Sequence, residues 1–280
     1  MTFRLDIVGR TDRGRHRQKN EDKFLVDPEI GFFIVADGMG GHACGEVASS
    51  LVTELCGEQM KRALQTGHVP VYIHVPKRDN LDPRTLLMGD AVKFANQAVH
   101  EAAQNDPAKH NMGTTMVAAL WLDGKLATAN VGDSRIYTVH AGKLIQQTMD
   151  HSFVQEQINR GLLKPEEAEK SELRNMLTRS VGVSEDVDVD LAEVEMTPGD
   201  YVLACSDGLT KMLKDSEIEQ AFAGAGTPDD IADDLVRKAN EAGGKDNVTV
   251  VVGKLSTKST EWPSLMDRVK AAVRKTMKGR

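Results

Sequence analysis

Residues 31–41 read Gly-Phe-Phe-Ile-Val-Ala-Asp-Gly-Met-Gly-Gly, an apolar run that ends in an aspartate and a glycine-rich turn. A short run of aromatic and β-branched residues predicts a buried, central β-strand. Asp37 and Gly38 follow that strand directly. Because Asp and Gly are also ordinary turn residues, one such strand end says little about function by itself.

Carboxylates stand beside turns or strand ends at four further places. These are Asn20-Glu21-Asp22, Gly132-Asp133-Ser134-Arg135, Ser206-Asp207-Gly208 and Lys245-Asp246-Asn247. Carboxylates that meet at one edge of a sandwich repel one another unless cations neutralise them. Oxygen ligands without a Cys or His pattern favour hard ions such as Mg²⁺ or Mn²⁺. Two such ions about 3.5–4 Å apart can activate a water that attacks a phosphoryl group.

The predicted strands come in consecutive groups, and so do the predicted helices. We expect strands at 3–9, 23–36, 114–122, 125–131, 134–140, 143–147, 187–195, 201–205 and 248–252, with tight turns at Asp123-Gly124 and Ala141-Gly142. Apolar residues at helical spacing predict helices at 46–65, 84–104, 215–224 and 228–241, with a loop at 66–83 and a mobile surface excursion at 150–185. This grouping is not a β-α-β alternation, so it predicts an α+β sandwich of antiparallel sheets with helices outside.

The amino-acid composition argues against several classes of function. The 280 residues carry 42 acidic and 35 basic side chains, a net charge of −7, and only 4% are aromatic. This balance argues against a nucleic-acid binder. No apolar run approaches the length of a membrane span, and the N-terminus is charged at once and lacks the apolar core of a signal peptide. Three cysteines in no zinc-binding spacing are interpreted as buried free thiols, which favours a cytoplasmic protein.

Six ordered segments resemble the metal-dependent protein phosphatases of the phosphatase 2C (PP2C, or PPM) class, in its bacterial form. They are Asn20-Glu21-Asp22, the segment 36–41, Gly113-Thr114-Thr115, Gly132-Asp133-Ser134-Arg135, Ser206-Asp207-Gly208-Leu209 and Gly244-Lys245-Asp246-Asn247. The match covers roughly residues 3–254. The resemblance implies a four-layer α-β-β-α sandwich in which two antiparallel sheets are flanked by helix pairs. It makes 1–255 the phosphatase domain, with 150–185 as the family's flap.

The resemblance also implies metal ligands, position by position. Asp37 would bridge two metal ions, either Mn²⁺ or Mg²⁺. Glu21 and the Gly38 carbonyl would complete the shell of the second ion, and Asp207 and Asp246 would hold the first.

Two further positions carry implied roles. Asp133, together with Asp207, resembles the pair that binds a third, weaker ion in bacterial members. Arg17 lies four residues before Glu21, where the family has its phosphate-binding arginine. A guanidinium has a fork geometry that suits phosphate oxygens.

Met39 marks a departure from the animal members of the family, which carry a histidine there that is often assigned as general acid. A methionine cannot donate a proton, so the proton source for the leaving alkoxide is not assigned. His42 is a candidate acid or a residue at a helix start. His151 is a catalytic candidate or a residue that fixes the base of the flap.

The remaining polar residues of the motifs have simpler interpretations. Asp22 is either a metal ligand through water or a turn former. Ser134 and Arg135 are interpreted as structural, and Thr114 and Thr115 as strand residues. Ser206 lacks the surroundings of a triad nucleophile.

These observations predict a protein serine/threonine phosphatase in which a metal-activated water attacks phosphorus in line. Its expected partners are phosphoproteins, among them a bacterial Ser/Thr kinase, and we expect a monomer. A phosphatase of an anti-sigma-type partner would use the same chemistry. A catalytically inactive binding module would lack the metal carboxylates, and a metal-dependent nuclease would need a basic groove.

The segment 256–280 is predicted to be a basic amphipathic tail. It carries seven basic and two acidic residues, and a stripe of apolar side chains recurs at helical spacing from Trp262 to Met277. Two interpretations stay open: a helix packed on the acidic domain, or a contact with an anionic membrane or a partner.

Overall fold

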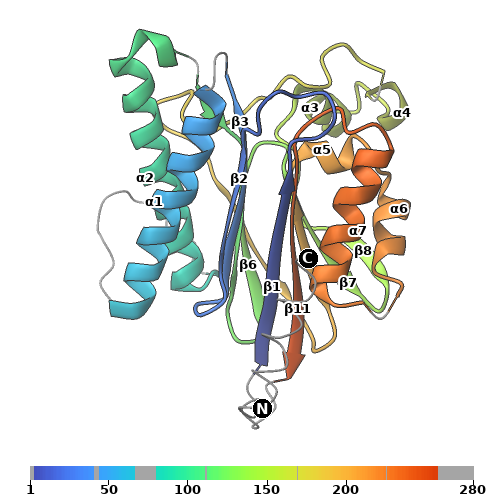
Figure 1. Ribbon diagram of the computed structural model, residues 1–280. Helices are drawn as coiled ribbons and strands as arrows, with labels where there is room; N and C mark the ends of the chain where they lie inside the picture. Colours follow the sequence, from blue (N-terminus) through green and yellow to red (C-terminus); the bar gives the residue numbers. More distant parts are fainter. Residues whose placement is uncertain are drawn as a thin grey trace, which may run out of the picture.

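Two antiparallel β-sheets lie face to face at the centre of the molecule (Figure 1). The computed structural model describes residues 3–40, 44–66, 80–110, 112–168, 170–224 and 226–257. In the order in which neighbouring strands pair, the first sheet contains β1 (Phe3–Asp12), β11 (Val248–Thr257), β10 (Tyr201–Cys205), β7 (Arg135–His140) and β8 (Lys143–Gln146). The second contains β2 (Asp22–Asp27), β3 (Phe32–Met39), β5 (Met116–Trp121), β6 (Lys125–Val131) and β9 (Asp190–Glu195), and the short β4 (Gly113–Thr114) pairs with β3.

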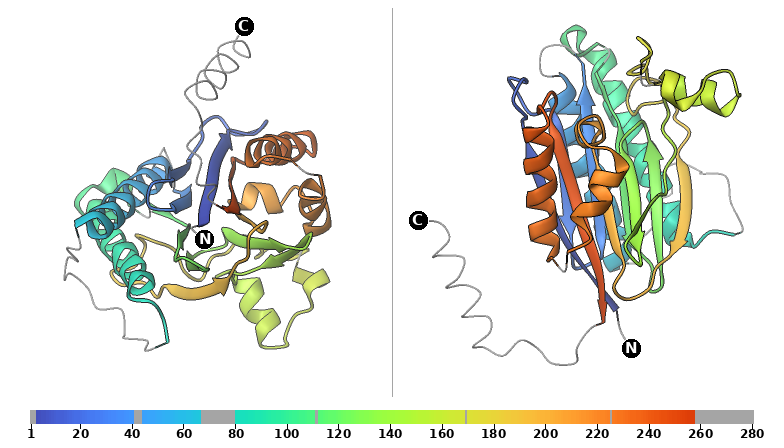
Figure 2. Two further views of the ribbon diagram at one scale, coloured as in Figure 1. Left: turned by 90° about the horizontal axis from the view of Figure 1, so that it is seen from below. Right: turned by 90° about the vertical axis from the view of Figure 1, so that its right-hand side faces the viewer.

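Helices cover the outer face of each sheet (Figures 1 and 2). The long helices α1 (Cys44–Thr66) and α2 (Pro83–Asn105) cover the second sheet, and α2 is followed by a 3₁₀ turn, η1 (Pro107–Lys109). The first sheet is covered by α5 (Asp207–Thr210), α6 (Asp215–Ala221) and α7 (Pro228–Glu241). The predicted α+β fold, a four-layer α-β-β-α sandwich, is therefore confirmed.

Strand β3 explains why its sequence is an unbroken apolar run. Phe33 and Val35 lie in the core between the two sheets, whereas Phe32 and Ile34 face the core under α1 and α2. Successive side chains of a strand point to opposite faces, so a strand with a core on each side needs apolar residues at every position. All four side chains have no exposed surface, and the strand delivers Asp37 to the edge of the sandwich.

The single strand predicted over 23–36 is wrong, because the chain forms two strands there. β2 and β3 pair with each other, and Asp27 lies opposite Phe32 across the turn. Gly31 closes this turn with φ of +68°, a conformation that other residues avoid. Both strands are apolar, so their hydrophobic pattern did not reveal the turn between them, although Pro28 is a turn signal. The tight turns predicted at Asp123-Gly124 and Ala141-Gly142 are confirmed, and all four of their residues have positive φ.

The other elements follow the predictions apart from shifts of several residues at their ends and two differences in kind. The predicted strand at 114–122 is divided into β4 and β5, and the short helix α5 starts at Asp207, where a turn was expected. The excursion at 150–185 holds two short helices, α3 (Phe153–Asn159) and α4 (Pro165–Ala168), which stand out from the sandwich in Figure 2. Its mobility stays a prediction. The three cysteines are free and buried, as predicted.

Several sequence predictions fall on residues outside the described ranges. They concern His42, most of the loop at 66–83 and nearly all of the tail, so the domain boundary at residue 255 stays a prediction. Strand β11 itself continues to Thr257. Within the described ranges, no helix is both long enough and apolar enough to cross a membrane.

Candidate active site

Asp37 lies near the end of strand β3, where two threonines fix the position of its backbone. Its carbonyl oxygen accepts hydrogen bonds from the Thr115 N–H at 2.9 Å and the Thr114 hydroxyl at 2.8 Å. Its own N–H donates to the Thr115 hydroxyl at 3.3 Å, and that hydroxyl also pairs with Ser134 at 2.7 Å. The predicted strand residues Thr114 and Thr115 therefore also fix the position of Asp37.

Gly38 occupies a place where no side chain fits. A Cβ atom there would lie 2.1 Å from the Gly45 carbonyl oxygen and 2.7 Å from that of Glu21. The Gly38 N–H donates to the Glu21 carbonyl at 3.2 Å, and Ser49 of α1 donates to the same oxygen at 2.6 Å. The start of α1, the end of β3 and the start of β2 thus meet at Glu21 and Gly38.

The other sheet brings Asp207 and Asp246 to the same edge. Asp207 follows β10 and begins α5, while Asp246 precedes β11. A Cβ atom on Gly208 would lie 1.8 Å from the Asn247 carbonyl oxygen, so these two segments are in direct backbone contact. Asp133 joins them from the connection between β6 and β7. The predicted carboxylates therefore converge from both sheets.

Burial raises the pKa values of three aspartates of the site, and the approach of neighbouring negative charges adds to this effect. For Asp37, the charges of Asp22, Asp207, Asp133 and Asp246 add to it and place the pKa well above its ordinary value. The pKa of Asp22 rises to about 7, with the charges of Asp207 and Asp246 contributing. The pKa of Asp133 also rises to about 7, raised by Asp207 and opposed by Lys211.

The donor set fits hard divalent cations. One carboxylate oxygen of Asp22 and one of Asp207 are buried without a hydrogen-bond partner in the described structure. Unpartnered oxygens and repelling carboxylates are both relieved by a bound cation. Within the described residues, no three His, Cys, Asp or Glu side chains surround a common point as they stand. Asp246 and Asp207 instead face two side-chain cations, Arg17 and Lys211.

Arg17 reaches the carboxylates from the loop between β1 and β2. Its Nη2 atom lies 2.8 Å from Asp246 Oδ2, and half of its side chain is exposed. The negative charges of Asp246, Asp37 and Glu21 raise its pKa against the effect of burial. The guanidinium therefore lies beside the carboxylates with its other side open to solvent.

The side chain of Asp22 is buried close to Asp207 and Asp246. Only 2% of its surface is exposed, and the Ser206 hydroxyl donates to its Oδ2 atom at 2.8 Å. The same hydroxyl accepts the Thr249 N–H at 3.0 Å. Ser206 therefore acts as a bridge between β11 and Asp22, in agreement with the interpretation that it is not a nucleophile.

His151 fixes the base of the flap. Its Nδ1 atom accepts the Gly132 N–H at 3.1 Å, and its Nε2 atom lies 3.0 Å from Asp190 Oδ2. Because Nδ1 accepts a hydrogen bond and so carries no hydrogen, Nε2 carries the hydrogen and donates to Asp190. Both ring nitrogens are occupied, which agrees with the structural interpretation of His151 and leaves none for an incoming substrate.

Arg135 is also structural, as predicted. Its guanidinium forms two hydrogen bonds to Asp150 at 2.9 and 2.7 Å and a third to the Tyr137 hydroxyl at 3.0 Å. This pair ties strand β7 to the segment that leads into the flap.

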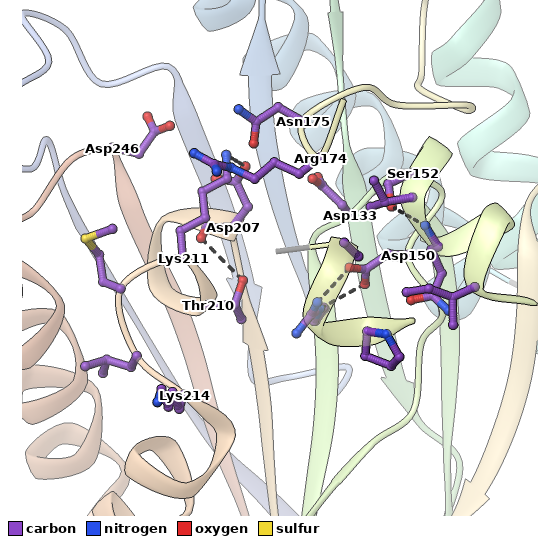
Figure 3. A pocket seen from close by; sticks show the side chains of 18 of the residues that line it. Asp133, Asp150, Ser152, Arg174, Asn175, Asp207, Thr210, Lys211, Lys214 and Asp246 are labelled. Atoms are coloured by element: carbon purple, nitrogen blue, oxygen red, sulfur yellow. Dashed lines mark hydrogen bonds and ion pairs between the residues drawn. The ribbon is translucent and has the colours of Figure 1, made fainter. Parts of the chain in front are cut away.

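A cleft of about 720 Å³ opens between the carboxylates and the flap (Figure 3). Asp133, Asp207 and Asp246 line one part of it, and side chains of α3 and α4 line another. Lys211, Lys214 and Lys245 add positive charge to the same cleft. Its walls are therefore suited to an anionic group attached to a larger chain.

Sequence reasoning missed two residues of this site. Asn247 accepts the Glu21 N–H at 2.8 Å and donates to the carbonyls of Arg13 at 2.9 Å and Lys19 at 2.8 Å, so it shapes the whole loop that carries Arg17. Its position next to Asp246 was the available signal. Lys211 forms an ion pair with Asp207 one helical turn away. Its i,i+4 spacing would have indicated the pair had α5 been predicted.

Comparisons with known proteins agree with this geometry. The family model of protein phosphatase 2C matches residues 11–235. A serine/threonine phosphatase stp of Listeria innocua is 36% identical over 248 residues, which cover 87% of this chain and 93% of the relative.

Solved structures give the same result. The serine/threonine phosphatase PstP/Ppp of Mycobacterium tuberculosis superimposes with a TM-score of 0.77 at 34% identity, covering 91% of this chain and all of that one. The catalytic domain of PstP in complex with two manganese ions has the same TM-score and coverage at 33% identity. Fold, edge carboxylates and relatives agree: the chain belongs to the protein phosphatase 2C family of metal-dependent serine/threonine phosphatases.

Proposed function

We propose that this chain removes phosphate from phosphoserine and phosphothreonine in proteins, with two divalent ions bound among the edge carboxylates. The observation that carries the proposal is the convergence of Asp37, Asp133, Asp207 and Asp246 from separate strand ends, with raised pKa values at Asp37 and Asp133. The ions, Mn²⁺ or Mg²⁺, would supply an activated water and positive charge for the phosphoryl oxygens. The manganese ions in the PstP complex support this assignment.

We assign the ligands as the family resemblance implies. Asp37 would be shared between the two ions, with Glu21 and the Gly38 carbonyl on one side and Asp207 and Asp246 on the other. The backbone contacts around Asp37, Glu21 and Gly38 support this assignment, because they hold the three groups in a fixed arrangement. Asp133 and Asp207 would admit a third, weaker ion.

Arg17 would bind the phosphoryl group. Its guanidinium is anchored on one side by Asp246 and is exposed on the other, so a phosphate can approach it without displacing the chain. Preorganised positive charge of this kind stabilises the charge that develops on the transferred phosphoryl oxygens.

The proposed substrates are phosphoproteins, among them a Ser/Thr kinase of the same cell. The cleft beside the flap has room for a phosphorylated side chain together with the peptide that carries it. We propose a cytoplasmic monomer that acts on proteins and not on nucleic acids, consistent with the net charge of −7.

The test is release of phosphate from a phosphothreonine peptide with and without Mn²⁺. Wild-type protein should turn over only with the metal, and Asp37→Asn and Asp207→Ala should each lose turnover while remaining folded by circular dichroism. Asp188→Asn removes an exposed carboxylate outside the cleft and should retain full activity. Full Mn²⁺-dependent activity in Asp37→Asn would rule out the two-ion assignment.

A further inference from the structure

Lys211 places a positive charge inside the carboxylate group. It follows the last residue of α5, and its ammonium contacts Asp207 Oδ2 one helical turn earlier. Its side chain is 35% exposed, and it lines the cleft together with Asp133, Asp207 and Asp246 (Figure 3). The charge of Lys211 acts on Asp133 as well as on Asp207.

The other two lysines of the cleft differ from Lys211. Within the described part of the chain, the ammonium groups of Lys214 and Lys245 form no ion pair with a carboxylate, although both residues line the same cleft. A lysine that lines the cleft therefore does not necessarily contact a carboxylate. The short helix α5 provides the necessary geometry, because it begins at Asp207 and places Lys211, which follows its last residue, one turn further along the same face.

Asp207 is also a shared residue in the proposed metal site. It is assigned to one of the two tightly bound ions and, with Asp133, to a third. A third ion held by Asp133 and Asp207 would come close to the Lys211 ammonium, which already contacts Asp207 Oδ2. It would also meet the repulsion of that ammonium, which is strong at such short range in a partly buried site.

We propose that the Lys211 ammonium is a built-in counter-ion of Asp133 and Asp207 that competes with the third divalent ion. This inference rests on the proposed two-ion phosphatase site. In this arrangement the side chain of Lys211 neutralises part of the negative charge of Asp133 and Asp207. The third ion binds only when it is concentrated enough to displace the lysine, whose flexible stem allows the ammonium to move aside.

The experiment is a calorimetric titration of the metal-free, full-length protein with Mn²⁺. Wild type should bind two ions tightly and one weakly. Lys211→Met keeps most of the aliphatic stem and removes the charge, so the weak site should tighten at least about tenfold, a larger factor than for the tight site that shares Asp207. Asp133→Ala in the Lys211→Met background should abolish the third site and leave two.

Two further variants separate a specific role from a general charge effect. Lys214→Met removes the same charge from the same cleft and should leave the third binding constant unchanged, as should Lys211→Arg, which keeps the charge. Lys211→Gln is a second neutral variant in case Lys211→Met does not fold, which circular dichroism will show.

The outcomes distinguish the two proposals. Two tight sites in wild type with an unchanged weak site in Lys211→Met would overturn the role of Lys211 and leave the two-ion site standing. Equal tightening in Lys214→Met would overturn it as well. A wild-type protein that binds no Mn²⁺ would overturn the two-ion site, and the role of Lys211 with it.

Discussion

Asp22 lies directly opposite Asp37 across the ladder between β2 and β3. Directly opposed residues of an antiparallel pair hold their side chains on the same face, about 5 Å apart at Cβ. Asp22 is buried, and Asp37, near the end of β3, is partly exposed. The family's fold therefore places two like charges side by side, an arrangement that costs stability unless a cation or a proton neutralises it.

The metal-free protein should lose stability as pH rises. The pKa of Asp22 is about 7 in the folded chain, above its ordinary value, so the folded state binds a proton more tightly than the unfolded state. That stabilisation is complete below about pH 4 and is lost as pH rises through about 7. Between pH 5 and 8 we expect a loss on the order of 2 kcal/mol from this residue.

Thermal unfolding of metal-free protein at pH 5, 6, 7 and 8 measures this loss. Asp22→Asn should make the dependence shallower, because an amide does not titrate and only the raised pKa values of Asp37 and Asp133 then contribute. Asp188→Asn, an exposed site, should keep the wild-type slope. A wild-type melting temperature that does not change from pH 5 to 8 would contradict the raised pKa.

Arg17→Ala should lower kcat/KM by about a hundredfold, because one preorganised charge on the phosphoryl group is lost. Stability should change by less than about 0.5 kcal/mol, since an exposed ion pair contributes little. Steady-state kinetics on a phosphothreonine peptide gives the first value and chemical denaturation the second. Arg13→Ala, in the same loop, removes a guanidinium that donates to the Gln18 carbonyl; it is the control and should stay within twofold of wild type in kcat/KM.

His151→Ala should destabilise the protein without changing the shape of its pH–activity profile. The variant leaves the buried Gly132 N–H without its acceptor, which costs about 1–3 kcal/mol. Activity should fall by a similar factor at every pH, because both ring nitrogens are already bound and His151 transfers no proton. Loss of one limb of the profile in this variant would instead identify His151 as a catalytic acid or base.

Removal of the tail after Thr257 should leave phosphatase activity intact. The cut falls there because Ser256 still donates to Asp6 at 2.8 Å and Thr257 still pairs with Phe3. Phosphate release and sedimentation with anionic liposomes should be measured for both chain lengths. Sedimentation of the full chain alone would support a membrane contact, and equal sedimentation would remove it. An inactive shortened chain would show that the tail belongs to the catalytic fold.

The sequence predicted the fold well where its patterns were long and unambiguous. The apolar run before Asp37 predicted a central strand, and the turn at Asp123-Gly124 predicted a hairpin. It failed at 23–36, where two apolar strands flank a short turn and merge into one pattern. The helix α5 was missed because four residues are too short for any helical periodicity.

The carboxylates of the site could be found from the sequence because each follows or precedes a strand. The residues that contact these carboxylates could not be found from the sequence. The contact of Ser206 with Asp22 joins residues 184 positions apart, and no local pattern encodes such a pairing. The same holds for the two threonines that hold the Asp37 backbone. Which cation each carboxylate faces depends on side-chain directions that only the folded chain determines.

The hydrogen bond between Asn247 and the Glu21 N–H has a consequence for the order in which activity appears during synthesis. It joins residues 226 positions apart, and β1 has β11 as its strand partner in the sheet. Strand β1 is synthesised early, but its partner β11 follows only after roughly ten to fifty seconds at ordinary elongation rates. A nascent or prematurely terminated chain therefore lacks the loop geometry around Arg17. We therefore expect no phosphatase activity from a chain that ends before residue 247.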